Sequence, residues 1–132
     1  MKRIKIRTTS RIEMVDVTSE IENLFSGREV NEGICLIYCP HTTAGVVINE
    51  HADPSVAEDI ASALSEHFPH RRPWRHLEGN ADAHVKSAVV GSSVMIPITG
   101  GRLALGTWQG IFFCEFDGPR NRELYIQVIS IE

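Results

Sequence analysis

The spacing of apolar residues along the chain predicts strands at both ends and helices in the middle. Polar and apolar residues alternate in residues 2–8 and 11–17, with the two-residue period of a strand. Residues 33–40 are apolar on both faces, which is typical of a central strand that is covered on both sides. Further strands are predicted at residues 45–49, 93–98, 102–105, 107–116 and 122–131.

Two helices are predicted from residues that favour first and last helical turns. Asp53 is a natural N-cap for a helix over residues 54–68, in which apolar residues recur at helical spacing. Asn80 is expected to cap a second helix over residues 81–90, and Gly91 is expected to end it. The spacing gives this second helix an inward face of apolar residues and one histidine: Ala81, His84, Val85, Ala88 and Val89.

The order of these elements predicts the fold class. Ser19 and Glu22 match a capping box, so a third, shorter helix is expected there, ending at Gly27. A chain of 132 residues without internal repeats has the length of one domain. We therefore expect a single α+β domain over residues 1–132, a largely antiparallel β-sheet or sandwich with two to three helices.

Composition and charge exclude several classes of protein. Apolar residues make up 42% of the chain and charged residues 23%, as in an ordinary soluble domain. A net charge of −4 leaves no basic excess to grip phosphates, so no nucleic-acid partner is expected. No apolar run approaches the roughly 18 residues of a membrane span, and the N-terminus does not resemble a signal peptide. Three cysteines, an odd number, favour buried, reduced thiols in the cytoplasm: Cys35, Cys39 and Cys114.

All six histidines lie between residues 41 and 84, which concentrates the candidate chemistry in one part of the chain. His41 follows a predicted strand, and His84 lies on the predicted inward face of a helix, so both suit a metal or catalytic site. The alternative for each is a histidine satisfied by ordinary hydrogen bonds. His76 can approach His84 if the loop folds over the helix start. The remaining histidines are expected to be solvated: His51, His67 and His70.

Acidic and basic groups add to this candidate site. Glu50 is a candidate base or ligand near the end of a strand. Glu115 interrupts an apolar stripe, so its pKa should be perturbed if it is buried, either at a functional site or in an ion pair. The alternative is a surface acid at the end of a strand. Gly106 and Gly110 lie within a strand pattern. Glycine at such a position often marks the close approach of another group to the backbone. Candidate phosphate-binding residues are Asn80, Arg120 and Arg122.

Several blocks of this sequence resemble the YjbQ family. They are H-T-T-A at 41–44, N-E with D-P at 49–54, H-L-E-G-N at 76–80 followed by His84, and G-R-L-A-L-G-T-W-Q-G-I at 101–111. The resemblance runs nearly end to end. It implies a small cytoplasmic α+β protein, a homotrimer, described as a secondary thiamine-phosphate synthase. The positions that match the family are His41, Asn49, Glu50, Asp53, His76, His84, Gln109 and Glu115.

The first functional interpretation is therefore an enzyme, a transferase that couples a pyrimidine diphosphate to a thiazole phosphate. His41, His76 and His84 would bind a divalent metal, zinc, and leave its fourth position open. Arg120 and Arg122, with Asn80, would hold the phosphate of a small metabolite. The catalytic candidates are Glu50, Glu115, Asn49, Asp53 and Gln109.

Two other interpretations remain open. In one, the same pocket belongs to a non-catalytic binding module for a small anionic metabolite. In the other, the protein is a structural trimer with a metal at the subunit junction. Turnover of a diphosphate substrate favours the enzyme, and stabilisation by a ligand without turnover favours the binding module. Loss of metal together with the trimer favours the structural interpretation.

Overall fold

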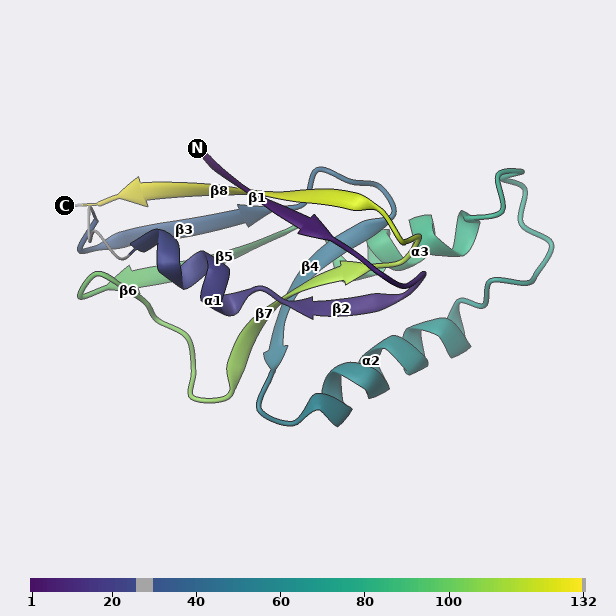
Figure 1. Ribbon diagram of the computed structural model, residues 1–132, viewed down its shortest axis with the longest axis horizontal. Helices are drawn as coiled ribbons and strands as arrows, with labels where there is room; N and C mark the ends of the chain where they lie inside the picture. The colour runs from purple at the N-terminus through teal and green to yellow at the C-terminus, as the bar shows by residue number, and fades with distance from the viewer. Residues whose placement is uncertain (26–29, 132) are drawn as a thin grey trace.

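The computed structural model describes residues 1–25 and 30–131, in which two antiparallel β-sheets face one another across an apolar core (Figure 1). The larger sheet has the strand order β1-β8-β3-β5-β6 and the smaller sheet the order β2-β7-β4. The strands of the larger sheet are β1 (Lys2–Arg7), β8 (Asn121–Ser130), β3 (Gly33–Tyr38), β5 (Ser93–Thr99) and β6 (Arg102–Leu103). Those of the smaller sheet are β2 (Glu13–Asp16), β7 (Gln109–Glu115) and β4 (Ala44–Glu50).

The core lies between the two sheets and is built from alternate residues of their strands. In β3, Cys35 and Ile37 point into it and are fully buried, opposite Ile96 of β5 and Ile126 of β8. Phe113 of β7 is buried from the other sheet. The prediction of a central strand at β3 is confirmed, because it pairs on both sides, although its outer face is only partly covered.

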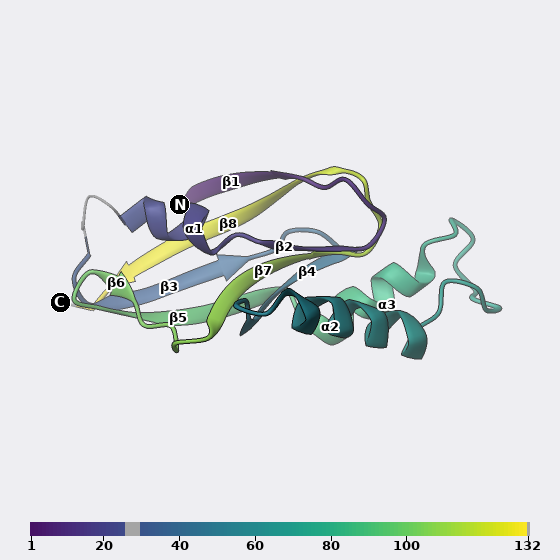
Figure 2. The ribbon, with the colours of Figure 1, turned by 60° about the horizontal axis from the view of Figure 1, so that its bottom comes forward.

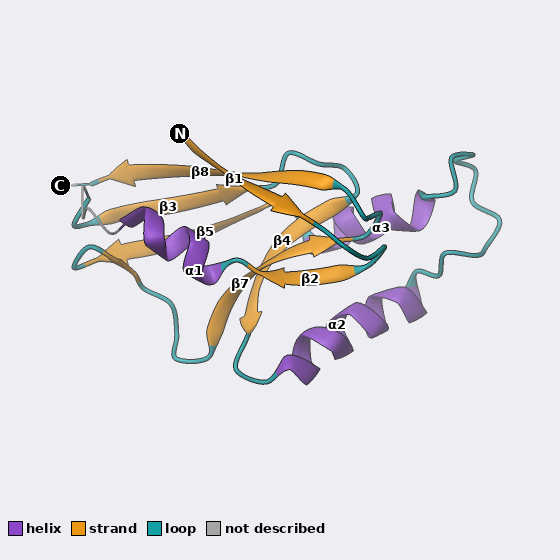
Figure 3. Ribbon diagram, in the orientation of Figure 1, coloured by secondary structure: helices purple, strands orange, loops and turns teal. Residues whose placement is uncertain are grey.

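Helices α2 (Pro54–His67) and α3 (Ala81–Val90) cover the outer side of the smaller sheet, where Phe112, Cys114 and Phe116 form a second apolar cluster. Helix α1 (Thr18–Glu22), which continues as the 3₁₀ turn η1 (Asn23–Phe25), packs instead against the core between the sheets, where its Ile21 is fully buried. Figure 2 shows α2 and α3 below the sheets and their connecting loop projecting away from them. The α+β prediction is confirmed, with mostly antiparallel strands and helices inserted mainly in mid-chain (Figure 3).

The helix ends agree with the sequence pattern at some positions and differ at others. Asp53 caps α2 as predicted, because its side chain accepts a hydrogen bond from the Ser55 backbone N–H at 3.0 Å. Asn80 stands at the N-cap position of α3, but its side chain makes no capping hydrogen bond. Helix α1 begins after Val17 without a side-chain cap, and the predicted helix end at Gly27 lies outside the described residues.

The buried face of α3 is not the predicted one. Asp82 and Lys86 are fully buried, whereas Val89 is 58% exposed and Ala88 is exposed too. The Lys86 ammonium group lies 2.7 Å from an Asp82 carboxylate oxygen, and Arg11 reaches the same carboxylate at 2.9 Å. These ion pairs allow charged side chains to occupy the inward face, which a hydrophobic pattern assigns to apolar residues.

The cysteine expectation is confirmed for burial. Cys35, Cys39 and Cys114 are free thiols in buried positions. Burial raises the pKa of Cys35 to about 11 and that of Cys114 to about 12. Such thiols are almost entirely protonated near neutral pH and are poor nucleophiles. Among the residues that the structure describes, no helix is long and apolar enough to cross a membrane.

Candidate functional site

His41 and His84 come together at a surface hollow between the end of β3 and helix α3. The hollow has a volume of about 450 Å³, and its lining includes Thr42 and Ser87 as well as the two histidines. Ser87 donates a hydrogen bond to the backbone oxygen of Ala44 at 2.7 Å, which ties α3 to the start of β4. Both imidazoles are partly exposed. The prediction of an inward, buried His84 is therefore wrong, and its side chain lies at the wall of an open hollow.

The hydrogen bond of His41 determines which of its ring nitrogens carries the proton. Its Nε2 accepts a hydrogen bond from the Glu123 backbone N–H at 3.0 Å. Burial lowers the pKa of His41, and the positive charge of Arg122 lowers it further. The ring is therefore neutral near pH 7, with its proton on Nδ1. In this arrangement His41 offers an N–H donor to a ligand and not a lone pair to a metal.

His84 also lines a second hollow, on its other side. This hollow measures about 600 Å³ and is lined by His76 and by the loop residues Arg72, Trp74 and Arg75. The ring centroids of His76 and His84 are 5.1 Å apart, which confirms that the loop brings the two histidines together. The Arg72 guanidinium carbon lies 4.3 Å from the centre of the Trp74 ring. We refer to the two hollows that share His84 as the His84 groove.

Glu115 and Arg122 form an ion pair inside the protein. The Arg122 Nε donates to Glu115 at 2.9 Å, and the Thr8 hydroxyl donates to the same carboxylate oxygen at 2.7 Å. Glu115 is fully buried and Arg122 is 6% exposed. Burial alone would raise the pKa of Glu115, but hydrogen bonds from Arg122 and Thr8 outweigh it and hold this pKa below its ordinary value. Glu115 is therefore not a surface acid, and the structure favours the ion pair among the alternatives for it.

Arg120 and Asn80 meet at Asp117, on the surface. The Arg120 guanidinium lies 3.1 Å from an Asp117 oxygen that also accepts a hydrogen bond from the Asn80 side chain at 2.8 Å. The Asn80 Oδ1 atom is buried and has no hydrogen-bond partner among the described residues. Since Arg122 is buried against Glu115 and Arg120 is exposed against Asp117, the two arginines do not form a joint phosphate clamp.

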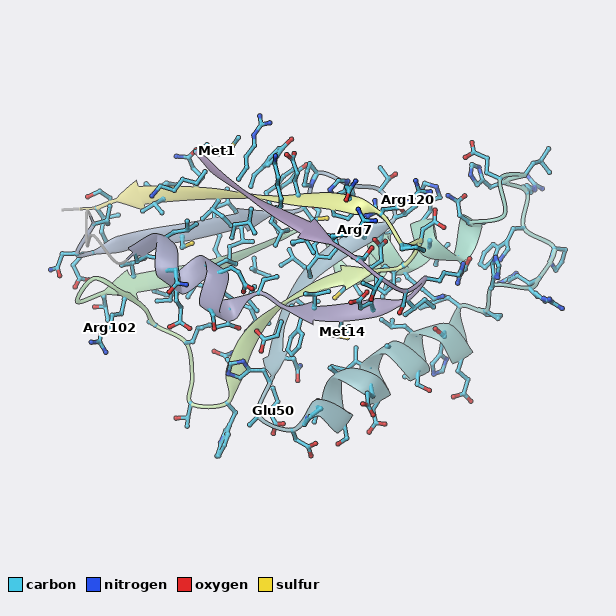
Figure 4. All side chains as sticks on the ribbon, in the orientation of Figure 1. Met1, Arg7, Met14, Glu50, Arg102 and Arg120 are labelled. Carbon is cyan, nitrogen blue, oxygen red and sulfur yellow. The ribbon has the colours of Figure 1, made fainter. Side chains whose placement is uncertain are left out.

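Within one chain, Glu50 lies far from the candidate site histidines His41 and His84. It pairs with Gln109 at one end of the β4–β7 ladder, and Ala44 pairs with Glu115 at the other end. Six residue steps of about 3.3 Å separate the two ends by about 20 Å. Figure 4 shows Glu50 near the start of α2 and Arg120 on the opposite side of the sheet.

Asn49, Asp53 and Gln109 share that distant end with Glu50, and all four make local contacts. The Glu50 carboxylate accepts a hydrogen bond from the Asp53 backbone N–H at 3.0 Å. The Asn49 side chain accepts one from the Glu50 backbone at 2.8 Å, and Gln109 accepts one from Gly106 at 2.8 Å. Within one chain the structure does not bring these four residues to the His84 groove, and their contacts stabilise the adjoining turns.

His51 makes specific contacts within the protein, although its sequence position indicates a solvated histidine. Its Nδ1 lies 2.8 Å from a carboxylate oxygen of Asp16, a residue 35 positions away. Its ring packs directly over Gly110, where a Cβ atom would lie only 2.3 Å from the imidazole. The glycine inside the strand pattern was the available signal of a close approach, and the approaching group is His51.

The described side chains do not complete a metal site. Among residues 1–25 and 30–131, no group of three or more His, Cys, Asp or Glu side chains is placed to hold a metal ion. The Nε2 lone pair of His41 is already used by the Glu123 backbone N–H. His76 and His84 remain as a pair of neighbouring imidazoles, fewer than the three protein ligands of a typical catalytic zinc site.

Comparisons with known proteins give a consistent result across the chain. The family model described as UPF0047 protein YjbQ-like matches residues 2–131. The chain is 50% identical to the UPF0047 protein YugU of Bacillus subtilis over 131 residues, 98% of this chain and 99% of that protein. It is 54% identical to a UPF0047 protein of Methanocaldococcus jannaschii over 128 residues, 97% of this chain and 93% of that protein.

Solved structures with the same fold include two proteins described without a function. An uncharacterised conserved protein of the YjbQ/UPF0047 family from Clostridium acetobutylicum is 42% identical, with a TM-score of 0.95. That match covers 98% of this chain and all of that one. A YbjQ-like protein of unknown function from Sulfolobus solfataricus is 35% identical, with a TM-score of 0.94 over 98% of this chain and 95% of that one.

Proposed function

This chain belongs to the UPF0047 family of YjbQ-like proteins, and from that premise and the geometry of the His84 groove we propose that it is an enzyme acting on a small phosphorylated metabolite. The observation that carries the proposal is the position of His84. It lines two adjoining hollows, with the neutral His41 on one side and His76 beside two arginines on the other. An imidazole between such groups is placed for acid–base chemistry on a bound anion.

The charged groups of the groove suit a phosphate or diphosphate. Arg72 and Arg75 line the hollow on the His76 side, and guanidinium groups bind phosphate oxygens through paired N–H donors. The Nδ1–H of His41 supplies a further donor. These three residues take over the anion-binding role that the sequence analysis gave to Arg120 and Arg122, which are engaged by Asp117 and Glu115.

Within this proposal, thiamine-phosphate synthesis is the specific reaction suggested by the family resemblance. A bond forms between the thiazole nitrogen and the pyrimidine methylene carbon, and the bond from that carbon to the diphosphate oxygen breaks. The arginines would stabilise the departing diphosphate, and His84 or His76 in its protonated form would donate a proton to it. Trp74 offers an aromatic surface for a planar heterocycle.

Zinc binding stays a prediction, and the reaction described above does not require the metal. A zinc ion at His76 and His84 would need further ligands from outside the described chain, such as substrate oxygens or a second subunit. Elemental analysis of protein purified without a histidine tag tests this directly. A zinc content that falls when His84 is replaced by Ala supports the site, and its persistence in that variant contradicts it.

We expect inorganic diphosphate to bind the native protein and to bind the His84→Ala and Arg75→Ala variants about tenfold more weakly or not at all. Isothermal titration measures the affinity, and diphosphate release from the two thiamine precursors measures turnover. His67→Ala and Arg102→Ala are matched controls: His67 ends α2, and Figure 4 places Arg102 at the far end of the larger sheet. Equal diphosphate affinity in His84→Ala and the native protein contradicts the proposal.

The titration also separates the enzyme from the non-catalytic binding module. Diphosphate or phosphate that raises the melting temperature without any turnover of the precursors favours the binding module. Turnover that disappears in His84→Ala, with unchanged far-ultraviolet circular dichroism, favours the enzyme.

We expect the protein to be a homotrimer in solution, and an uncovered apolar sheet face supports this proposal. On the outer face of the larger sheet, Met95 is 66%, Ile129 47% and Tyr38 44% exposed. The strand register places Met95 beside Leu36 and Tyr38 beside Tyr125, so these side chains form one contiguous patch. Apolar patches of this kind mark interaction surfaces.

Sedimentation equilibrium at micromolar concentration tests the trimer. The Met95→Lys variant should shift the native trimer toward monomer, because a charge on the patch would be buried in the interface. Leu77→Lys is the matched control: Leu77 is 94% exposed on the loop between α2 and α3, away from the sheet. A native protein that sediments as a monomer contradicts the prediction.

A further inference from the structure

A separate cavity lies between strand β2 and helix α2. It has a volume of about 410 Å³, and none of the residues that line it lines the His84 groove. Its walls include Met14 of β2, Ala57 of α2 and Phe112 of β7. Figure 4 shows Met14 on the side of β2 that faces α2. The size is within the range of small-molecule sites, which are largely apolar with a few polar groups.

The imidazole of His51 is one of the polar groups that line this cavity, and it is held in one position. Its backbone N–H donates to the Trp108 carbonyl at 3.0 Å. Its ring packs over the bare backbone of Gly110, and its Nδ1 lies 2.8 Å from the Asp16 carboxylate. The backbone hydrogen bond, the packing of the ring face on Gly110 and the contact of Nδ1 with Asp16 thus hold the imidazole in place.

Asp16 is itself held by groups on the neighbouring elements. One of its carboxylate oxygens accepts hydrogen bonds from the Thr18 backbone N–H, at 3.0 Å, and from the Thr18 hydroxyl. That hydroxyl accepts a hydrogen bond from the Ile111 backbone N–H at 2.9 Å. Burial raises the pKa of Asp16, but hydrogen bonds from Thr18 and His51 outweigh it and place this pKa below the ordinary value.

An ionised Asp16 determines the tautomer of His51. The carboxylate accepts the Nδ1–H, so in the neutral ring Nε2 carries the lone pair. Within the described ranges Nε2 has no hydrogen-bond partner. A carboxylate that orients an imidazole in this way recurs in proteins whose imidazole accepts a proton or hydrogen bond from a ligand.

The charges around the cavity determine which ligands can approach. Every other ionisable side chain in its lining is acidic: Glu13, Asp16, Asp53 and Glu58. No lysine or arginine of the described chain lines it. The negative field disfavours an anion and favours a cation. The His84 groove, which contains Arg72 and Arg75, has the opposite preference.

We propose that this cavity is a second ligand site, which binds a small primary amine in its protonated form, with the ammonium N–H donating to His51 Nε2 and an apolar body against Met14 and Phe112. The ammonium group supplies the donor that Nε2 lacks and the charge that the carboxylates favour. The apolar body occupies the space between β2 and α2.

Benzylamine is the probe, and benzoate is its matched anion of similar shape. We expect benzylamine to bind the native protein saturably, with chemical-shift changes in the amide signals of His51 and Phe112, and benzoate not to bind. In His51→Gln the benzylamine affinity should fall at least tenfold, and in His67→Gln it should be unchanged. His67 is the last residue of α2, the helix that forms one wall of the cavity, but it does not line the cavity.

A second variant keeps the test valid if His51→Gln fails to fold. Ala57→Leu fills the cavity from α2 and leaves Asp16 and His51 in place, so it should abolish benzylamine binding while the protein stays folded. A purely structural His51 predicts unchanged benzylamine affinity in His51→Gln, and that result overturns the proposal. Benzoate binding as tight as benzylamine binding overturns it as well. The diphosphate titration uses a different pocket, so either proposal can fail alone.

Discussion

Replacing Glu115 with Ala is expected to lower the free energy of unfolding by about 3–5 kcal/mol. The substitution leaves the Arg122 guanidinium buried without its carboxylate partner, since Arg122 is 6% exposed and its other side-chain contacts are to the Thr43 hydroxyl and carbonyl. A buried charge without a counter-charge is far more costly than the missing contact alone. Equilibrium unfolding in urea measures the change.

Two further variants show whether the loss comes from the buried charge. Arg120→Ala removes an exposed pair with Asp117 and should cost less than about 1 kcal/mol. The double variant Glu115→Leu, Arg122→Met removes both charges and should recover most of the loss. If Glu115→Ala loses no more stability than Arg120→Ala, the buried pair does not have the role assigned to it.

The dependence of stability on pH follows from the same pair. The pKa of Glu115 is lower in the folded state than its ordinary value of 4.5. Below that value the unfolded chain binds the proton more readily, so stability is fully present above about 4.5 and falls as the pH drops toward the folded pKa. The acid limb of the stability curve should therefore be shallower in the double variant than in the native protein.

Much of the fold could be predicted from the sequence, because in most elements the local sequence pattern agrees with the burial of the residues in the structure. β3 alternates between two apolar faces, and Asp53 and Pro54 fix the start of α2. The face of α3 could not be predicted in this way. Asp82 and Lys86 look like solvent-facing residues, and Arg11, which also pairs with the Asp82 carboxylate, lies 71 positions away in the sequence. An ion pair formed by tertiary contact leaves no trace in a hydrophobic pattern.

The site was partly predictable for a similar reason. The clustering of histidines in sequence indicated the contact of His76 with His84 and the meeting of His84 with His41 at one hollow. The separation of Glu50 from these histidines depends on the antiparallel register of β4 with β7, which places the two ends of the ladder on opposite sides. The sequence of either strand alone does not contain that register.

The contact between His51 and Asp16 could not be predicted either, because it too depends on how the strands are arranged. Asp16 is the last residue of β2 and His51 follows the last residue of β4, so each has an ordinary local explanation at the end of a strand. The contact arises because β7 lies between β2 and β4, so the end of β2 and the residue after β4 meet across it at Gly110. Strand order therefore determines the contact that holds His51 at the cavity.

Replacing Asp82 with Ala is expected to destabilise the protein by about 3–5 kcal/mol, because it leaves the fully buried Lys86 ammonium group without a counter-charge. Arg11, whose side chain is 33% exposed, can turn to solvent and should add little to this loss. Urea unfolding of the single variants and of Asp82→Ala, Lys86→Met measures the coupling between the two positions.

The double variant also tests whether this ion pair acts on the His84 groove. Asp82, His84 and Lys86 are on the same helix, and Asp82 ties that helix to Arg11 in the segment between β1 and β2. If the charges serve only stability, Asp82→Ala, Lys86→Met should regain most of the lost free energy and bind diphosphate with native affinity. Recovered stability with a diphosphate affinity still about tenfold weaker would show that the pair also positions His84. A loss of stability below about 1 kcal/mol in Asp82→Ala would contradict the burial of an uncompensated Lys86 charge.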